Sequence, residues 1–365
     1  MLTRASAAGC LVAALLALGA GPALARFAPT GQPPGAVLGF GVSGSSWLAL
    51  VVPGSAPGAV VFGTGVPYVS HDAGATWQQV AMNGLKDPFP GVDVAVAPDG
   101  AFWLSVQDYQ SAATFLMRMD RNGTAFDPVA RFPSTQSTTQ VSVPAWDMQE
   151  HLWAAVTSGQ PRQSEVDRVA ADGTIAERVP VNVENGSARR VTFVGGRLYA
   201  DFGTIQIFQV RGKSATALGQ SGQNTVSIGF PLLAVGKSVL TESGLSFDGG
   251  QTFASRFTAV RAVVGNDRLV RTLASFGATQ ADGGRILRRV SSRFFAPTAL
   301  TLPTNTTFVG QARQALVAVA GGEVQLHGGA VPKLTARGHL SATARGMIAR
   351  ANHWRHQAGL PPMLG

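Results

Sequence analysis

Three carboxylates are the candidates in this chain for acid–base chemistry: Asp93, Asp201 and Glu242. Each lies in or beside a short apolar run that predicts a β-strand. Two carboxyl groups, one acting as acid and the other as base or nucleophile, can hydrolyse a glycosidic bond, and such a pair has no fixed spacing in sequence. A solvated surface carboxylate is the simpler interpretation of each residue taken alone.

Metal and cofactor chemistry have no comparable pattern. His353 and His356 are three residues apart on a predicted helix and could share one of its faces, but no acidic residue follows Glu323. We interpret the two histidines as part of a solvated basic face. The sequence shows no phosphate-binding loop, nucleotide fingerprint or Ser-His-Asp arrangement, so we expect neither a metal nor a cofactor.

The composition indicates what kind of elements must position these groups. Hydrophobic residues make up 45% of the chain and charged residues 13%, a balance that excludes disorder. The 44 Gly and 21 Pro argue against a helix bundle and favour a turn-rich β-protein. The net charge of +9 favours acidic polymers as partners, whereas the dispersed basic residues and the lack of a recognition motif argue against nucleic acid.

The first 25 residues predict an export signal. Arg4 precedes the apolar run from Leu11 to Leu18, which is too short to span a bilayer, and Ala23-Leu24-Ala25 is a small-x-small cleavage site. We expect cleavage after Ala25 and a mature chain that begins at Arg26, without a transmembrane anchor. Cys10, the single cysteine, is removed with the signal, so the mature chain has no disulfide.

Two eight-residue segments share the pattern Ser-x-Asp-x-Gly-x-Thr-aromatic. The matching residues are Ser70, Asp72, Gly74, Thr76 and Trp77 in the first segment, and Ser246, Asp248, Gly250, Thr252 and Phe253 in the second. This chemistry predicts a hairpin turn, because an Asp carboxylate can accept hydrogen bonds from amides of its own loop and Gly supplies a positive φ. We therefore interpret both aspartates as structural.

Weaker copies of this turn lie at residues 119–124, 171–174, 211–214 and 282–285. The mean interval is about 42 residues, inside the range of roughly 40 to 50 typical of four-stranded propeller blades. Strand–turn–strand units such as Val191–Val194 followed by Arg197–Tyr199 lie between the copies. The sequence predicts an all-β fold, a six- to seven-bladed β-propeller over residues 36–335 with a short C-terminal helical tail.

Residues 36–335 resemble the Asp-box β-propellers, the superfamily of bacterial neuraminidase repeats that includes sialidases, other glycosidases and non-catalytic secreted propellers. The resemblance implies that the boxes lie on the blade periphery. A sialidase would need an arginine cluster, a Tyr–Glu pair and an Asp, and its first arginine precedes the first box. Here Arg26 is the only arginine between residues 26 and 70, and the chain has three tyrosines, so the sialidase pattern is not met.

Residues 336–365 predict a basic amphipathic helix that begins near Ser341 and ends before Gly359. Within it, residues 352–363 (NHWRHQAGLPPM) resemble the opening of a CAP (SCP-like) domain, with Met363 where leucine is usual. The tail is thus either a basic tail or the truncated start of a second domain.

We expect an exported, extracellular or periplasmic propeller that acts as a non-catalytic binding or scaffold module. Its partner would be a carbohydrate or protein, and an acidic surface polymer suits the charge. The alternative is a glycoside hydrolase of extracellular or cell-wall polysaccharide, for which the three carboxylates named first are the candidates.

Overall fold

In the computed structural model, the described residues are 27–29, 31–56, 65–134, 139–183, 186–203, 207–218, 231–235, 237–241, 244–255, 260–264, 270–272, 285–289, 295–312 and 315–327. The chain divides into two units, Met1–Gly328 and Gly329–Gly365, and all described residues belong to the first. The predicted signal, the helical tail, the CAP-like segment and Glu242 lie outside the described residues.

The described strands form seven antiparallel or mixed sheets, numbered here in chain order. Sheet 1 contains β2 (Gly35–Ser43), β3 (Ser46–Pro53), β4 (Val66–Ser70) and β5 (Gln78–Gln79). Sheet 2 contains β6 (Ala81–Met82), β7 (Pro88–Pro90), β8 (Ala95–Val96), β9 (Phe102–Asp108), β10 (Ala113–Met119) and β11 (Ala125–Pro133). Sheet 3 contains β12 (Gln140–Val141), β13 (Ala145–Trp146), β14 (Leu152–Ser158), β15 (Gln163–Val169) and β16 (Ile175–Val181).

The second half of this unit repeats the arrangement. Sheet 4 contains β17 (Arg190–Val194), β18 (Arg197–Asp201), β19 (Ile207–Arg211) and β20 (Ser214–Ala217). Sheet 5 contains β21 (Pro231–Val235), β22 (Ser238–Thr241), β23 (Gly244–Ser246) and β24 (Ala254–Ser255). Sheet 6 contains β25 (Val260–Val264), β26 (Val270–Thr272), β27 (Arg285–Arg289) and β28 (Phe295–Thr301). Sheet 7 contains β29 (Thr306–Ala312), β30 (Ala315–Ala320), β31 (Glu323–His327) and β1 (Phe27–Pro29).

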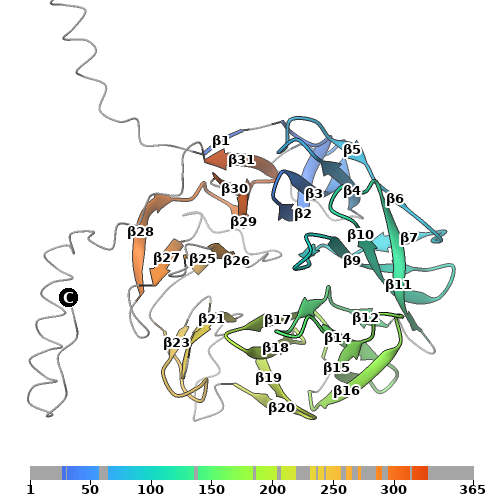
Figure 1. The fold of residues 1–365 in the computed structure, drawn as a ribbon, viewed down its shortest axis with the longest axis vertical. Coiled ribbons are helices and arrows are strands. Elements are labelled where there is room, and N and C mark those ends of the chain that lie inside the picture. Colours follow the sequence, from blue (N-terminus) through green and yellow to red (C-terminus); the bar gives the residue numbers. More distant parts are fainter. Residues whose placement is uncertain are drawn as a thin grey trace, which may run out of the picture. The chain divides into compact units, whose positions relative to one another are not determined.

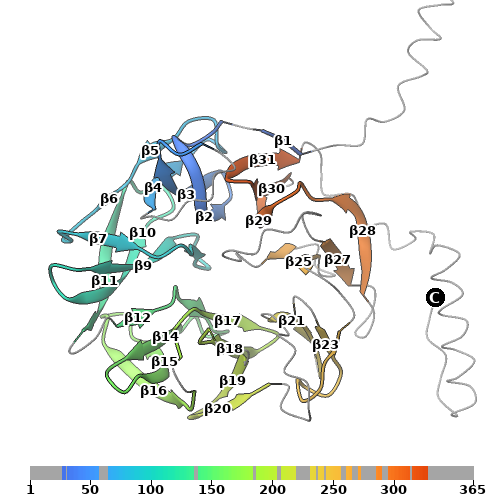
Figure 2. The ribbon, with the colours of Figure 1, turned by 180° about the vertical axis from the view of Figure 1, so that it is seen from behind.

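Figures 1 and 2 show the sheets of this unit arranged around a common centre, which is the arrangement of a β-propeller. The described residues contain strands and turns and no helix. Among them, no helix is long and apolar enough to cross a membrane. The all-β fold predicted from the composition and the turn repeats is therefore confirmed.

The core of the unit lies between neighbouring sheets. Middle strands such as β3 and β14 are buried almost throughout, because sheets pack on both of their faces. An outer strand such as β16 instead alternates between exposed and buried residues. One core cluster joins Leu48 and Leu50 of sheet 1 to Phe102 and Leu104 of sheet 2, and the next clusters join sheet 2 to sheet 3 and sheet 3 to sheet 4.

Sheet 7 joins the two ends of the unit. Strand β1 pairs antiparallel with β31, with Phe27 opposite His327 and Pro29 opposite Gln325. Beyond β1, the Gln32 side chain continues the pairing: Nε2 donates to the Val324 carbonyl at 2.7 Å, and Oε1 accepts from the Val324 amide at 2.9 Å. The first described strand thus completes the last sheet (Figure 1).

Candidate functional site

Two of the three predicted carboxylates, Asp93 and Asp201, lie in one electrostatic cluster with Arg190. Arg190 Nη2 donates to Asp93 Oδ1 at 3.4 Å, and Asp201 lies directly opposite Arg190 in the pairing of β17 with β18. Asp93 comes from sheet 2 and the other two residues from sheet 4, so this ion pair joins sheets that are not consecutive in the chain. The side chains of Arg190 and Asp93 are only 17% and 19% exposed.

Burial controls the charge of this cluster. It raises the pKa of Asp93, an effect that Arg190 opposes and the neighbouring Asp201 increases. Burial also raises the pKa of Asp201. Two effects oppose this shift: the Gly203 amide donates to the Asp201 carboxylate at 2.7 Å, and Arg189 and Arg190 are positively charged. Two carboxyls with raised pKa values are the kind of group that acid–base catalysis uses. Glu242, the third candidate, lies outside the described residues.

The first Ser-x-Asp-x-Gly-x-Thr-aromatic segment forms the turn between β4 and β5. Asp72 accepts from the Thr76 amide at 2.9 Å and from its hydroxyl at 2.6 Å, while Ser70 Oγ donates to Asp72 at 2.7 Å. The hydrogen bonds from Thr76 and Ser70 hold the pKa of Asp72 far below its usual range. Gly74 has a φ of +87°, and a Cβ there would collide with the ring of Trp47.

The second segment forms the turn between β23 and β24 with the same bonds. Ser246 Oγ donates to Asp248 at 2.7 Å and accepts from the Gly250 amide at 2.8 Å, and the Thr252 amide donates to Asp248 at 3.0 Å. Burial would raise the pKa of Asp248, but the bonds from Thr252 and Ser246 outweigh it and keep that pKa well below normal. In both turns the carboxylate accepts hydrogen bonds from its own loop, as the structural interpretation of these aspartates predicts.

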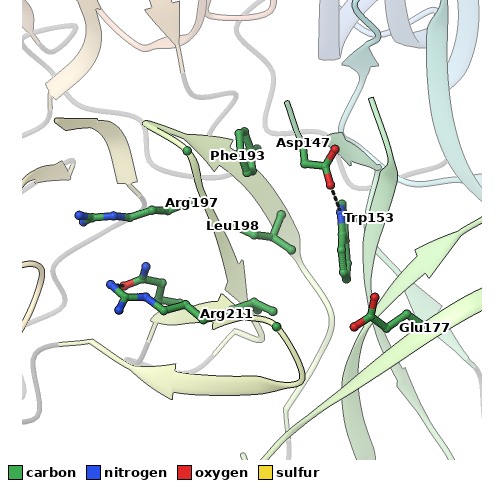
Figure 3. A pocket seen from close by; sticks show the side chains of 11 residues that line it. Asp147, Trp153, Glu177, Phe193, Arg197, Leu198 and Arg211 are labelled. Atoms are coloured by element: carbon green, nitrogen blue, oxygen red, sulfur yellow. Dashed lines mark hydrogen bonds between the residues drawn. The ribbon is translucent and has the colours of Figure 1, made fainter. Parts of the chain in front are cut away.

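A pocket that the sequence did not indicate lies between sheets 3 and 4 (Figure 3). Its volume is about 460 Å³, within the range of roughly 300 to 1,000 Å³ typical of small-molecule sites. Sheet 3 contributes Asp147, Trp153 and Glu177. The apolar residues that sheet 4 contributes are Phe193, Leu198 and Val210. Its polar residues are Arg197, Gln209 and Arg211, and the turn glycines Gly196 and Gly212 complete the lining.

The sheet 3 wall is held rigid by its own hydrogen bonds. Trp153 Nε1 and His151 Nδ1 both interact with Asp147 Oδ2 at 3.0 Å. Burial would raise the pKa of Asp147, but these bonds and the amides of the turn keep it below its usual value. On the same wall, Arg168 Nε donates to Glu177 Oε2 at 3.3 Å. Both acids are thus engaged, Asp147 by Trp153 and His151 and Glu177 by Arg168.

The sheet 4 side carries the positive charge of the pocket. In Figure 3, Arg197 and Arg211 extend in the same direction, away from Trp153 and Glu177. Gln209, two residues before Arg211 on β19, lies within 3.4 Å of the Arg211 guanidinium. Leu198, Val210 and Gln209 are buried, so the apolar part of this wall is packed and the arginines form its polar border.

The described residues contain no group of three or more His, Asp or Glu side chains that could hold a metal ion. The predicted hairpin at residues 191–199 placed Arg197 just after a turn, but the sequence held no sign that Arg211 or Trp153 would lie nearby. A hairpin register can be read from its turn, whereas the pairing of one sheet's face with the next depends on the packing of the whole ring.

No family model matches the chain, and no curated protein matches it. Among solved structures, it is similar to the WD40 β-propeller domain of Doa1, with 11% identity over 83% of this chain and 95% of that chain and a TM-score of 0.49. It is also similar to BamB from Moraxella catarrhalis, with 13% identity over 80% of this chain and 84% of that chain and a TM-score of 0.40. A third similar structure is a gluconolactonase from Xanthomonas campestris, with 13% identity over 77% of this chain and 67% of that chain and a TM-score of 0.32. These similarities assign no activity. The architecture places the chain in the class of β-propeller proteins.

Proposed function

We propose that this protein is an exported, seven-bladed propeller of the Asp-box type that binds carbohydrate without catalysis, and that the pocket between sheets 3 and 4 is its binding site. The pocket itself carries the proposal. It combines a volume suited to a few sugar units, an aromatic and aliphatic lining from Trp153, Phe193 and Leu198, and fixed polar groups at its edges. Sugars present apolar ring faces and a rim of hydroxyls, which such a lining complements.

The state of the pocket's acids favours binding over hydrolysis. A glycosidase needs one carboxyl group that stays protonated, with a raised pKa, beside a second carboxylate. The pKa of Asp147 is instead lowered, and Glu177 is ion-paired with Arg168. Both groups are therefore suited to accept hydrogen bonds from hydroxyls and unsuited to donate a proton to a leaving group.

Binding can be tested by calorimetric titration of the full chain with oligomers of glucose, xylose, N-acetylglucosamine and galacturonate. We expect at least one of them to bind. The Phe193→Ala variant should weaken that binding at least tenfold, because Phe193 lines the pocket. Phe89→Ala, a matched control at an exposed ring in sheet 2, should leave it unchanged. Equal binding by Phe193→Ala and the unaltered chain, or no binding to any oligomer, would contradict the proposal.

A glycosidase is the second candidate, and the cluster of Asp93, Arg190 and Asp201 favours it. Both aspartates have raised pKa values, as an acid catalyst requires. If they were catalytic, the chain would release reducing ends from a polysaccharide, and Asp93→Asn would abolish the release. Under the binding proposal the unaltered chain releases none.

A further inference from the structure

Corresponding positions of sheets 3 and 4 hold aromatic rings of different size. In sheet 3, Trp146 of β13 lies directly opposite Leu152 of β14. In sheet 4, Phe193 of β17 lies directly opposite Leu198 of β18. The two leucines are the first and second residues of their strands, each just after the turn of an equivalent hairpin. Trp146 and Phe193 are therefore structural counterparts in consecutive sheets.

The rings that face these two residues are counterparts as well. Trp103 of β9 lies opposite Ala95, and Trp153 of β14 lies opposite Ala145, in the same pairing of strands. Trp103 packs in the core cluster between sheets 2 and 3, and Trp153 packs in the core cluster between sheets 3 and 4. Each tryptophan thus points from its own sheet toward the next one along the chain.

The two interfaces differ in how these rings meet. Between sheets 2 and 3, Trp103 and Trp146 pack edge to face, with ring centroids 5.9 Å apart and an angle of 66° between the rings. Between sheets 3 and 4, the counterparts Trp153 and Phe193 both line the pocket. A phenyl ring is smaller than an indole ring. The pocket therefore lies at the place where Trp146 closes the neighbouring interface.

A hydrogen bond orients the Trp153 ring in this pocket. Its Nε1 donates to Asp147 Oδ2 at 3.0 Å, and Asp147 is the first residue after β13. The first residue after β8, at the corresponding place in sheet 2, is Ala97. There the Trp103 Nε1 has no hydrogen-bond partner among the described residues. Asp147 thus fixes the Trp153 ring before any ligand arrives, which lowers the cost of binding.

Both walls of the pocket are apolar where a ring would enter. Figure 3 shows Leu198 across the pocket from Trp153, and Leu198 and the adjacent Val210 are buried. An axial hydroxyl of a sugar ring would point into one of these walls and lose water without gaining a partner. Equatorial hydroxyls point outward from the rim of the ring. They can reach the border of the pocket, where the Glu177 side chain is 25% exposed and its carboxylate can accept hydrogen bonds.

We propose that the pocket holds one pyranose ring between Trp153 and Leu198, and that the small size of Phe193 makes room for it. The sugar ring takes the place of the aromatic ring that closes the neighbouring interface. This arrangement selects β-1,4-linked saccharides whose ring hydroxyls are all equatorial, which are those built from glucose, xylose or N-acetylglucosamine. The inference rests on the carbohydrate-binding function proposed above and names the class of sugar.

The selectivity of the full chain tests the proposal without any variant. β-1,4-Mannohexaose has the linkage of cellohexaose and differs from it in having an axial hydroxyl at C2. In calorimetric titrations, we expect at least one of cellohexaose, xylohexaose and chitohexaose to bind at least tenfold more tightly than mannohexaose.

Exchanging the rings tests the role of Phe193. Phe193→Trp gives this interface the ring pair of the neighbouring one, so it should weaken binding of the preferred hexaose at least tenfold without lowering the thermal unfolding temperature. Trp146→Phe makes the reverse exchange at the corresponding position between sheets 2 and 3 and should leave the affinity unchanged. Full affinity in a folded Phe193→Trp variant would overturn the inference.

The outcomes separate this inference from the proposed function. If mannohexaose binds as tightly as the other hexaoses while Phe193→Ala still weakens binding, the selection of equatorial sugars is wrong and the sugar pocket stands. The same conclusion follows if only the galacturonate oligomer binds, because its ring carries an axial oxygen at C4. If no oligomer binds, the inference and the proposed function are both wrong.

Discussion

At the scale of single residues, Asp167 is a buried carboxyl that neither turn nor pocket uses. It lies in the middle of β15, is 1% exposed, and its Oδ1 has no hydrogen-bond partner among the described residues. Burial raises its pKa to about 7; the nearby Glu165 adds to the shift and Arg178 opposes it. The folded state therefore holds a proton on Asp167 that the unfolded chain releases at about pH 4.

This difference predicts a pH dependence of stability. Between about pH 4 and pH 7 the folded state binds more protons than the unfolded state, so the free energy of unfolding falls as the pH rises through this window. Asp167→Asn removes the titration. The variant should be more stable than the unaltered chain at pH 8, by up to about 4 kcal/mol, and its stability should vary less between pH 5 and 8. Denaturant unfolding at a series of pH values measures both.

Asp87→Asn, at an exposed position, makes the same change in net charge and serves as the control. It should keep the pH profile of the unaltered chain. A profile for Asp167→Asn that parallels the unaltered chain from pH 5 to 8 would show that Asp167 does not titrate in this range.

At the scale of elements, the two Asp turns show how a short motif fixes a hairpin. Asp72 and Asp248 each hold the amide and hydroxyl of a threonine four residues later. The first turn also reaches beyond its own sheet, because Trp77 Nε1 donates to the Gly31 carbonyl at 3.0 Å. The motif therefore stabilises a turn and, at Trp77, the segment that follows β1.

Loss of the carboxylate should destabilise the turn. Asp72→Ala removes the acceptor of several hydrogen bonds and should lower the free energy of unfolding. Asp248→Ala should lower it as well, by about 1 to 3 kcal/mol. Binding of sugar by the folded fraction should not change, because neither residue lines the pocket. Thermal unfolding and calorimetric titration of the same samples measure the two effects.

A substitution of Ala73, in the first turn, serves as a control because it should not destabilise the turn. Its φ is +60°, and the equivalent position of the second turn is Gly249, with a φ of +87°. Ala73→Gly should therefore be neutral or slightly stabilising. If it destabilises as much as Asp72→Ala, the effect of the aspartate reflects general sensitivity of the loop rather than its hydrogen bonds.

At the scale of the whole propeller unit, closure depends on the pairing of the first described strand with the last. Residues 292 positions apart in sequence meet through Gln32 and Val324, and the Val324 side chain is fully buried. The closing contact forms only when both ends of the unit are present, because it joins the first described strand to the last within sheet 7. A closed ring removes the exposed sheet edges that promote aggregation.

Gln32→Ala should weaken this closure selectively. It leaves both backbone groups of Val324 without their partner and should lower the free energy of unfolding by about 1 to 3 kcal/mol. Amide hydrogen exchange should become faster in β30 and β31, while exchange in β14 and β15, on a distant sheet, stays unchanged. Gln79→Ala, at an exposed position of β5, is the control. Uniform acceleration across all sheets, or none, would contradict a role in closure.

Much of the fold could be predicted from local pattern. The strand–turn–strand unit predicted at residues 191–199 matches β17 and β18. The all-β class followed from composition and repeated turns. The carboxylate candidates were predicted one by one, but the Asp93–Arg190 contact that brings Asp93 and Asp201 into one cluster was not.

The sequence by itself determined the turns and strands, because hydrogen bonds within a loop and alternation along a strand act over a few residues. Only the tertiary structure decided which sheets face each other: β1 with β31, Asp93 with Arg190, and Trp153 with Leu198 across the pocket. These contacts follow from the packing of all the sheets around one centre. They bring together residues up to about 300 positions apart, for which no local pattern carries a signal.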